Sequence, residues 1–484
     1  MKDISEHQSD AAGAQTPYQA PPNGWRTFLT VWMTQSISVF GSALTFFSVT
    51  VWLTTVLFPR PEQKPALGIA LSAVSLAFAL PVVFGAPIAG AWADRHDRKR
   101  TMIAMDALSG LLSLVLAGLV VTNSLNLPLL VLLLVLFSAV GAFHGSAFDT
   151  SYVMIVPEHL LPRANGMMQT MWALSGVISP AVAAAILSLP GLARQGHIPG
   201  SLGAALGRMA SGMPIAIILD ALTFFAAAIT LGFLHIPSPK RSDLRSTDGK
   251  VKKSMWADVK EGALYIWRRR PLLWLLGTFT VANFVSGPEN VLLPLLIKFN
   301  LAADWTRRGF TLETALALMS MLASVGGVAG GFFISSWGGL KARRVYGVLV
   351  PLIGAGLVMT VLGFSPFLFV SAAAVALINA MTPIMNAHSQ TIWQIQTPRE
   401  LQGRVFSVRR LIAQVSWPVS TALAGWLAGA FNPGTVLAIL GMQAALVLDS
   451  LRQSHELHER RTEARFRQLV RHSSDAVLIV GPDG

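Results

Sequence analysis

Residues 85–100 read GAPIAGAWADRHDRKR, and this stretch decides how the rest of the chain is interpreted. A run of small apolar residues ends here in seven consecutive ionisable side chains, from Asp94 to Arg100. A soluble amphipathic helix would spread such charges along one face. Here they follow an uncharged segment that begins near Pro65. The pattern therefore indicates the point at which a helix leaves a membrane.

The composition of the whole chain agrees with a membrane protein. Of its 484 residues, 53% are hydrophobic and 13% are charged, whereas soluble domains carry roughly 25% charged residues. The chain has no cysteine, which excludes a disulfide, a zinc–thiolate site and a thiol nucleophile. The net charge of +13 comes from short basic clusters between apolar runs. Such clusters fit anionic lipid headgroups, and we expect no nucleic-acid partner.

Twelve apolar segments have about the length that a helical membrane span needs, ~17–25 residues. They lie near residues 25–57, 66–91, 102–121, 127–148, 167–189, 213–234, 272–297, 311–335, 345–364, 367–392, 405–430 and 433–448. The longest polar connection, 237–270, divides them six and six. The sequence therefore predicts an all-α integral membrane protein with 12 transmembrane helices in two six-helix halves, at 25–236 and 271–449.

The polar segments predict the orientation in the membrane. Residues 1–24 lack the order of a signal peptide and are expected to form a disordered cytoplasmic tail. The connection 237–270 is interpreted as a cytoplasmic linker that ends in a short amphipathic helix at 255–267. With the amino terminus inside, 30 of the 37 Lys and Arg residues fall on the inner side. The positive-inside rule then predicts a multi-pass protein of the inner (plasma) membrane with both termini cytoplasmic.

Two weak internal sequence repeats support the division into halves. The stretch GAWADRHDRKR after the second span is matched by SSWGGLKARRV after the eighth. In the same way, LLPRANGMMQTMWALSGVISP at the fifth span is matched by RELQGRVFSVRRLIAQVSWP at the eleventh. This arrangement, with the basic loop after the second span, resembles the major facilitator superfamily of secondary transporters. The resemblance covers about residues 25–450.

The residues that carry the resemblance align with the loop signature GxLaDRxGRK of that family, and they are Gly90, Asp94, Arg95, Arg98 and Lys99. The resemblance implies that this loop locks the inner ends of the two halves together in the outward-open state. Asp97 occupies the place of the usual loop glycine, and Asp tolerates a left-handed turn fairly well. In the second copy Gly339 replaces the acid, so the first loop is expected to dominate. The alternative is that the bases only fix the topology.

Further stretches are similar to a branch of the family that includes macrolide-efflux proteins and siderophore exporters. They are ILDALTFFAAA in the sixth span, LPLLI in the seventh and LQGRVFSVRRLI entering the eleventh. That branch mostly exports small amphiphiles. The antiporter motif GxxxGPxxGG of the fifth span is SGVISPAVAA here, which keeps Pro180 but replaces the glycines by Ser or Ala. The buried arginine of the fourth span is absent, so the usual proton relay of the family is incomplete here.

Ionisable residues inside the spans are functional candidates because their burial in lipid is costly. Glu289 lies in the seventh span, and helices one, four, seven and ten line the cavity of the family. Removal of a carboxylate from water favours its protonated form, so Glu289 is a proton-coupling candidate, with gating at the outer mouth as the alternative. Asp220 in the sixth span is the second candidate, with a structural bond between helices as the alternative. Asp106, close to the inner end of the third span, is also a functional candidate, with a contact to the loop bases as the structural alternative.

Uncharged polar residues in the spans that line the cavity of the family are candidates for substrate contacts. Such a lining among Phe, Met and Trp suits large amphipathic ligands held mainly by apolar contacts. For each residue the alternative is an interhelical hydrogen bond. The candidates are Gln35, Ser38, His144, Asn283, Asn290, Asn379, Asn386 and Gln390.

The carboxyl end, residues 450–484, departs from this pattern. A charged helix is followed by RFRQLVRHSSDAVLIVGPDG, which resembles the beginning of a PAS domain. A complete sensory domain needs on the order of a hundred residues to bury a core. We interpret the segment as an incomplete PAS-like start, from a longer transporter–sensor fusion or a remnant. A charged tail with a chance similarity is the alternative.

Three functions follow from these observations. The first is a proton-coupled antiporter that exports small hydrophobic or amphiphilic compounds by alternating access. The second is an importer of a similar substrate, and the third is a membrane receptor that signals through a sensory domain. The sequence has no GxxxxGK[ST] loop and no paired-carboxylate, zinc or Ser-His-Asp arrangement. We therefore expect no enzyme activity, no cofactor and no metal. The expected partners are a small-molecule substrate, the lipid bilayer and the proton.

Overall fold

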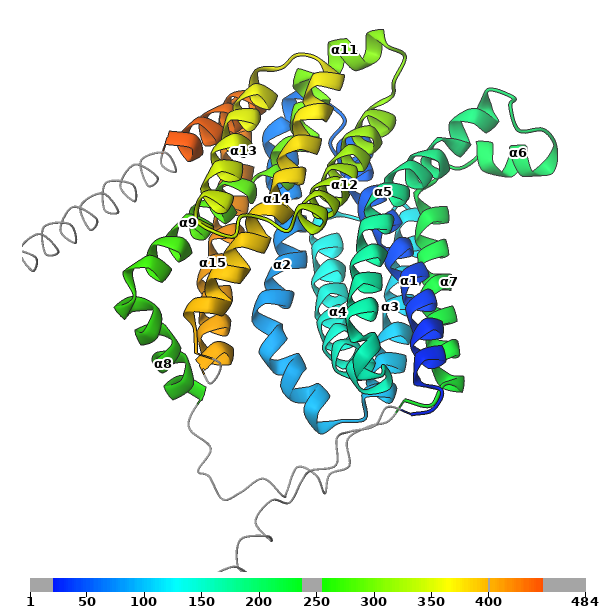
Figure 1. Ribbon diagram of the computed structural model, residues 1–484. Helices are drawn as coiled ribbons and strands as arrows, with labels where there is room; N and C mark the ends of the chain where they lie inside the picture. The colour runs from blue at the N-terminus through cyan, green and yellow to red at the C-terminus, as the bar shows by residue number, and fades with distance from the viewer. Residues whose placement is uncertain (1–20, 237–254, 399–400, 447–484) are drawn as a thin grey trace, which may run out of the picture.

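The computed structural model describes residues 21–236, 255–398 and 401–446 (Figure 1). Most of the predicted amino-terminal tail, part of the linker and the PAS-like segment lie outside these residues. The expectations for them stay predictions.

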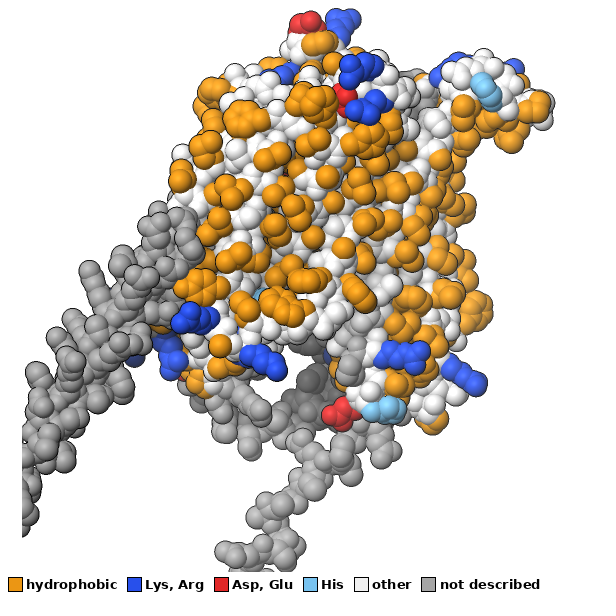
Figure 2. Space-filling view, turned by 45° about the horizontal axis from the view of Figure 1, so that its top comes forward, with side chains coloured by type: hydrophobic (Ala, Val, Ile, Leu, Met, Phe, Trp, Pro, Cys, Tyr) orange, Lys and Arg blue, Asp and Glu red, His pale blue; other side chains and the backbone are white. Residues whose placement is uncertain are grey.

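Ten helices in the described part of the chain are long and apolar enough to cross a membrane. Figure 2 shows hydrophobic side chains over the middle of the visible face, with charged side chains gathered toward its two ends. This is a multi-pass membrane protein. The ten helices are α1 (Gly24–Trp52), α2 (Lys64–Arg95), α3 (Arg98–Val121), α4 (Leu127–Ile155), α5 (Leu161–Arg194), α7 (Met213–Phe233), α12 (Leu312–Trp337), α13 (Tyr346–Phe364), α14 (Leu368–Gln396) and α15 (Gln402–Ala430).

The two remaining predicted spans are not long continuous helices. The seventh is broken into α9 (Arg270–Ser286), α10 (Glu289–Leu295) and a π-turn (Leu296–Asn300). The break falls at Gly287 and Pro288. Proline has no backbone N–H to donate within a helix, and glycine adopts backbone dihedral angles that other residues avoid, so a break is expected at this pair. The twelfth is described as a shorter apolar helix, Pro433–Leu446. The fold is therefore all-α as predicted, while the count of twelve spans is not confirmed.

Three shorter helices lie in the connections between the spans. Two of them, α6 (Gly200–Gly207) and α11 (Ala302–Arg307), lie at the upper end of the molecule in Figure 1. The third, α8 (Met255–Arg268), covers the segment predicted as a short amphipathic helix. It packs against α15, where Arg404 donates a 2.7 Å ion-paired hydrogen bond to Glu261.

The helices pack as two groups with related internal contacts. In the first group α3 packs on α7, α2 on α4, and α1 on both α5 and α7. In the second group α14 packs on α12 and α13, and α15 packs on α9. The groups meet where α2 contacts α15 and where α5 contacts α12. The second spanning helix of each group, α2 or α12, thus contacts the fifth spanning helix of the other group, α15 or α5. This symmetry is expected of two repeated halves.

The two groups are joined at the end where α2 begins. The hydroxyl of Ser72 donates a 2.7 Å hydrogen bond to the carbonyl oxygen of Thr421. A Cβ atom on Gly425 would lie 2.3 Å from the Ser72 Oγ, so α2 and α15 approach each other too closely for a side chain there. Lys298 donates to the carbonyl oxygens of Thr54 and Phe58, each at 2.6 Å. We call this the closed end.

The groups separate toward the other end, where α2 ends and α3 begins. Along this part of α2, Phe84 is 60% exposed and Ile88 is 65% exposed. A Cβ atom on Gly85 or Gly90 would meet nothing within 4 Å. In Figure 1 the lower part of α2 stands apart from α15, and in Figure 2 the surface is hollowed at the lower edge. We call this the open end, and it carries the charged loop with the basic residues Arg95, Arg98, Lys99 and Arg100.

Candidate functional site

The charged loop at the open end is built around the start of α3. Asp97 is the N-cap of this helix, with φ −63° and ψ 114°, and its carboxylate accepts a 2.8 Å hydrogen bond from the backbone N–H of Arg100. Asp97 is thus extended, and the left-handed turn that Asp would tolerate is not formed here. Asp is among the preferred N-cap residues, which explains why it replaces glycine here.

The basic side chains of the loop contact their own half of the molecule. Arg98 is buried and donates to the carbonyl oxygen of Thr150 on α4 at 3.1 Å. Lys99 donates to the carbonyl oxygen of Gly232 at the end of α7, at 2.9 Å, where a cation also suits the helix dipole. Arg95 is exposed. Asp94 lies in α2, and its side chain is outside the described part of the structure.

Three helices of the first half bring a buried polar cluster together. Asp106 on α3 is 2% exposed, and its Oδ2 accepts a 3.3 Å hydrogen bond from Gln35 on α1. Its Oδ1 lies 3.1 Å from the Nε2 of His144 on α4, and the imidazole remains 16% exposed. Asp106 thus faces two of the predicted cavity residues, and not the loop bases that the sequence offered as its structural alternative. The third candidate of this half, Ser38, is also buried.

Asp220 on α7 is held by hydroxyl groups from two neighbouring helices. It is 1% exposed, and it accepts hydrogen bonds from Thr45 at 2.8 Å, Ser113 at 3.2 Å and Ser42 at 3.3 Å. A carboxylate can accept about four hydrogen bonds, and these three satisfy most of that capacity. The surroundings favour the structural alternative, in which Asp220 joins α1, α3 and α7.

Glu289 opens the short helix α10 directly after the break at Pro288, and it is half-buried. Its carboxylate lies beside the Asn379 side chain on α14. The Asn379 amide also donates to the carbonyl oxygen of Val375 at 3.0 Å. The structure therefore pairs two predicted residues from the seventh and tenth spans. Asn290, the next residue, is exposed.

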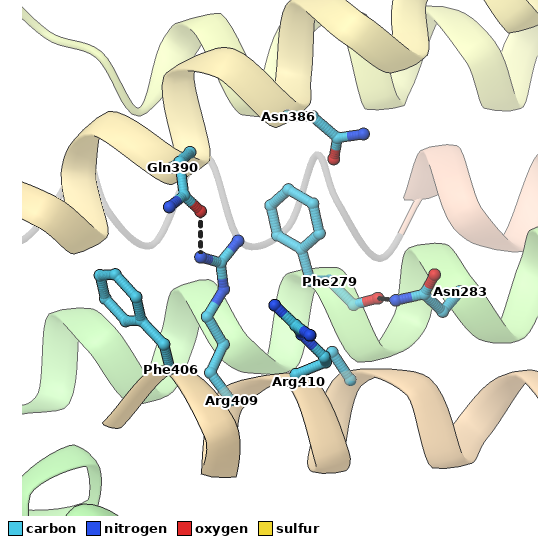
Figure 3. A pocket seen from close by; sticks show the side chains of 8 residues that line it. Phe279, Asn283, Asn386, Gln390, Phe406, Arg409 and Arg410 are labelled. Atoms are coloured by element: carbon cyan, nitrogen blue, oxygen red, sulfur yellow. Dashed lines mark hydrogen bonds between the residues drawn. The ribbon is translucent and has the colours of Figure 1, made fainter. Parts of the chain in front are cut away.

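A pocket of about 290 Å³ lies between α9, α14 and α15 in the second half (Figure 3). Three predicted cavity residues line it, namely Asn283, Asn386 and Gln390. The Asn283 amide is directed back to its own helix, where it donates to the Phe279 carbonyl oxygen at 3.0 Å. Asn386 and Gln390 are exposed. Three of the eight predicted cavity residues therefore share one pocket, and their contact with a substrate stays a prediction.

The sequence reasoning missed the two charged residues of the pocket, Arg409 and Arg410. Both lie within the predicted eleventh span at 405–430, so the rule that ionisable residues in spans are functional candidates applied to them. They were counted as topology-fixing charges instead. In Figure 3 both side chains extend from α15 into the space beside Phe279.

Among the described residues there is no group of three or more His, Cys, Asp or Glu side chains that could hold a metal ion. The geometry that the described chain does offer is a set of apolar helices in two related groups, joined at one end and separated at the other. Polar residues face the space between or within these groups. This arrangement is that of a membrane transporter.

The family model named Major Facilitator Superfamily matches residues 31–421. The chain belongs to this family. It is 27% identical to macrolide efflux protein A of Streptococcus pyogenes over 414 residues, which covers 84% of this chain and 90% of that protein. It is 29% identical to the multidrug efflux pump Tap of Mycolicibacterium fortuitum over 394 residues, which covers 78% and 85% of the two chains.

Solved structures show the same fold at low sequence identity. A bacterial homolog of the human lysosomal transporter Spinster, in an inward-facing and unoccupied conformation, aligns with a TM-score of 0.60 at 14% identity. The alignment covers 90% of this chain and 93% of that chain. A bacterial homologue of the iron transporter ferroportin in an inward-facing state aligns with a TM-score of 0.56 at 17% identity, covering 88% and 98% of the two chains.

Proposed function

We propose that this protein exports small hydrophobic or amphiphilic compounds across the inner membrane by alternating access of its two halves. The observation that carries the proposal is the asymmetry between the closed end, where Ser72 bonds Thr421, and the open end, where the same two helices separate. A central space that opens at one end only is one of the two states that alternating access requires. The efflux functions named for the relatives support export of compounds of this class.

The open end faces the cytoplasm in this proposal. The excess of Lys and Arg on that side supports the orientation, because 30 of the 37 basic residues fall there with both termini inside. The structure then corresponds to the inward-facing state, which takes up substrate from the cytoplasm or the inner leaflet. The loop formed by Gly90, Asp94, Arg95, Arg98 and Lys99 closes this end in the opposite state. The contacts described for Arg98 and Lys99 are with α4 and α7 of their own half, which supports a released lock.

Export is driven by the proton gradient in this proposal, and the proton binds a carboxylate in or beside the central space. Glu289 with Asn379 is one site, and Asp106 with His144 is a second that the structure adds. Asp220 stays a candidate from the sequence, although its three hydroxyl partners support a structural role. A carboxylate that gains and loses its proton can couple that event to helix movement.

Accumulation of dyes and antibiotics in cells with and without the protein tests the proposal. Lower accumulation that a proton uncoupler abolishes is the expected result. Lower accumulation that resists the uncoupler would remove proton coupling and leave export. Higher accumulation would show import, and an unchanged accumulation of every compound would favour a receptor.

Three variants assign the coupling group in the same assay. Glu289→Gln, Asp106→Asn and Asp220→Asn each remove one carboxylate charge and keep the shape of the side chain. We expect one of the first two to abolish the uncoupler-sensitive part of export, and Asp220→Asn to act mainly through protein abundance. Full uncoupler-sensitive export by all three variants would remove these assignments.

A further inference from the structure

Two guanidinium groups face one pocket without an acidic partner. Arg409 and Arg410 line the pocket between α9, α14 and α15. Within the described residues, no carboxylate forms an ion pair with either of them. Arg404, on the same helix, pairs with Glu261 at 2.7 Å. Arg409 is half-buried and Arg410 is exposed. Among the described residues, Arg409 is therefore a partly buried positive charge without an ion-paired carboxylate, and an anion would complete its site.

The surroundings of Arg409 hold its side chain in place and leave donors free. Its Nη1 donates to the Gln390 side-chain oxygen at 2.7 Å and its Nη2 donates to the Ser389 hydroxyl at 3.3 Å. The guanidinium carbon lies 5.1 Å from the Trp393 ring centroid and 5.9 Å from that of Phe279. A guanidinium has five N–H donors, so these two bonds orient the group and leave three donors for a ligand.

The remainder of the pocket selects the kind of molecule that carries the anion. Phe279, Phe406 and Ala413 form an apolar wall, and the amides of Asn386 and Gln390 are exposed beside it. Figure 3 shows Arg409 and Arg410 side by side on α15, with Phe279 between Arg410 and Asn386. A ligand with an apolar body and one anionic head matches this lining, whereas two uncompensated arginines disfavour a cationic head.

We infer that Arg409 and Arg410 form a recognition site for an oxyanion, so that the preferred substrates are amphiphiles that carry a carboxylate or a similar acidic group. This inference rests on the proposed export function and names the substrate class of the same cavity. Arg409 makes the bidentate contact for which a guanidinium is suited. Arg410 adds a second positive charge at the mouth. An anionic lipid headgroup offers the same chemistry, and the experiment separates that source from a substrate.

Binding of a matched pair of probes to the purified protein tests the inference. The probes are 11-(dansylamino)undecanoic acid and its methyl ester, measured by dansyl fluorescence with the protein in phosphatidylcholine nanodiscs at pH 7. The acid is expected to bind the wild type at least tenfold more tightly than the ester, as one charge-assisted interaction would give. In Arg409→Gln this preference is expected to fall below about threefold, and an unfolding temperature equal to that of the wild type shows that the variant is folded.

Two further variants separate the roles of charge and geometry. Arg409→Lys keeps the positive charge but lacks the planar guanidinium that can donate two parallel hydrogen bonds, and it is expected to retain part of the preference for the acid. Arg404→Gln removes one charge from the same helix outside the pocket, and is expected to retain all of it. Equal affinity of the wild type for acid and ester would overturn the inference. A full preference for the acid in both Arg409→Gln and Arg410→Gln would do the same.

A lipid arm and a cell arm complete the experiment. In nanodiscs that contain phosphatidylglycerol, the preference for the acid is expected to persist, and its loss would identify a lipid headgroup site and overturn the substrate assignment. In cells, export of the ester without any preference for the acid would leave the proposed function standing and remove this inference. A failure to export any amphiphile, with the binding preference intact, would remove the proposed function instead.

Discussion

Asp304 on α11 shows how a single carboxylate can join two segments at the closed end. Its Oδ2 accepts a 2.9 Å hydrogen bond from the Arg308 Nε and another from the backbone N–H of Leu368, at the start of α14. The Arg308 bond, followed by the Leu368 bond, holds the pKa of Asp304 below its usual value. An acidic residue at a helix start is favourable for the same reason as an N-cap.

This arrangement predicts a pH-dependent stability difference. Because the pKa of Asp304 is lower in the folded protein, its contribution is present above the pKa of the unfolded chain, about 3.9. The contribution is lost as the pH falls through the lower folded value. Asp304→Asn is expected to lower the unfolding temperature at pH 7, measured by tryptophan fluorescence in detergent, and the difference from the wild type is expected to shrink toward pH 3. A difference that is the same at both pH values would contradict this.

At the level of residues, the sequence predicted polar groups better than their partners. Asn283, Asn386 and Gln390 were named from their positions in the spans, and one pocket contains all three. The Asp106–His144 contact could not be predicted, because it depends on the rotation of α3 against α4. Arg409 was missed because a basic residue near the start of a span can either fix the membrane topology or belong to a binding site, and the sequence pattern is the same for both. Only the absence of a described acidic neighbour separates them.

The contact between α2 and α15 depends on the absence of a side chain at Gly425. A Cβ atom there would lie 2.8 Å from the Ser72 Cβ and 2.9 Å from the Gly68 carbonyl oxygen. Overpacking of this kind costs roughly 1–3 kcal/mol, which corresponds to a shift of about 5–150-fold in a two-state equilibrium. Gly425→Val is therefore expected to disfavour the closed end and to lower export about tenfold or more in the accumulation assay.

Gly118→Val is the matched control for this substitution. Gly118 lies on an exposed part of α3, and a Cβ atom there would meet nothing within 4 Å. Export by this variant is expected to equal that of the wild type. Wild-type export by Gly425→Val would show that the close approach of α2 and α15 is not needed in the cycle.

The charged loop between α2 and α3 supports a second prediction at the scale of secondary-structure elements. If the loop locks the cytoplasmic end in the outward-open state, Asp94→Asn removes charge-assisted bonds of about 1.5–3 kcal/mol. The variant is expected to spend more time open to the cytoplasm and to lose about tenfold or more of its export. Its binding of the neutral dansyl ester is expected to be unchanged, since in the proposed cycle the loop is released in the inward-facing state. Export at the wild-type rate would reduce the loop to a topology signal.

Helices were the most predictable elements, because a lipid-length apolar run leaves few alternatives to a helix. Ten of the predicted segments correspond to long helices. The broken seventh segment was missed, because its apolar run continues on both sides of Gly287 and Pro288. The turn signal in SGP was present in the sequence, but the length criterion alone does not use it.

The state of the whole molecule could not be read from the sequence. One sequence has to support both the joined and the separated arrangement of each end, so its patterns are compatible with either. The small residues Gly68, Ser72 and Gly425 permit close approach of α2 and α15. They do not say when it occurs. The closed end and the open end are properties of the packed halves, and the proposed cycle consists in their exchange.

Distances across the two ends, measured by electron spin resonance between pairs of spin labels, test this exchange most directly. The chain has no cysteine of its own, so labels can be placed at Arg100 and Lys341 for the open end and at Arg60 and Arg307 for the closed end, all of which are exposed. On addition of a transported amphiphile together with a change of pH, the distance at the open end is predicted to shorten while that at the closed end lengthens. Two distances that stay fixed, or that change in the same direction, would contradict alternating access by these two halves.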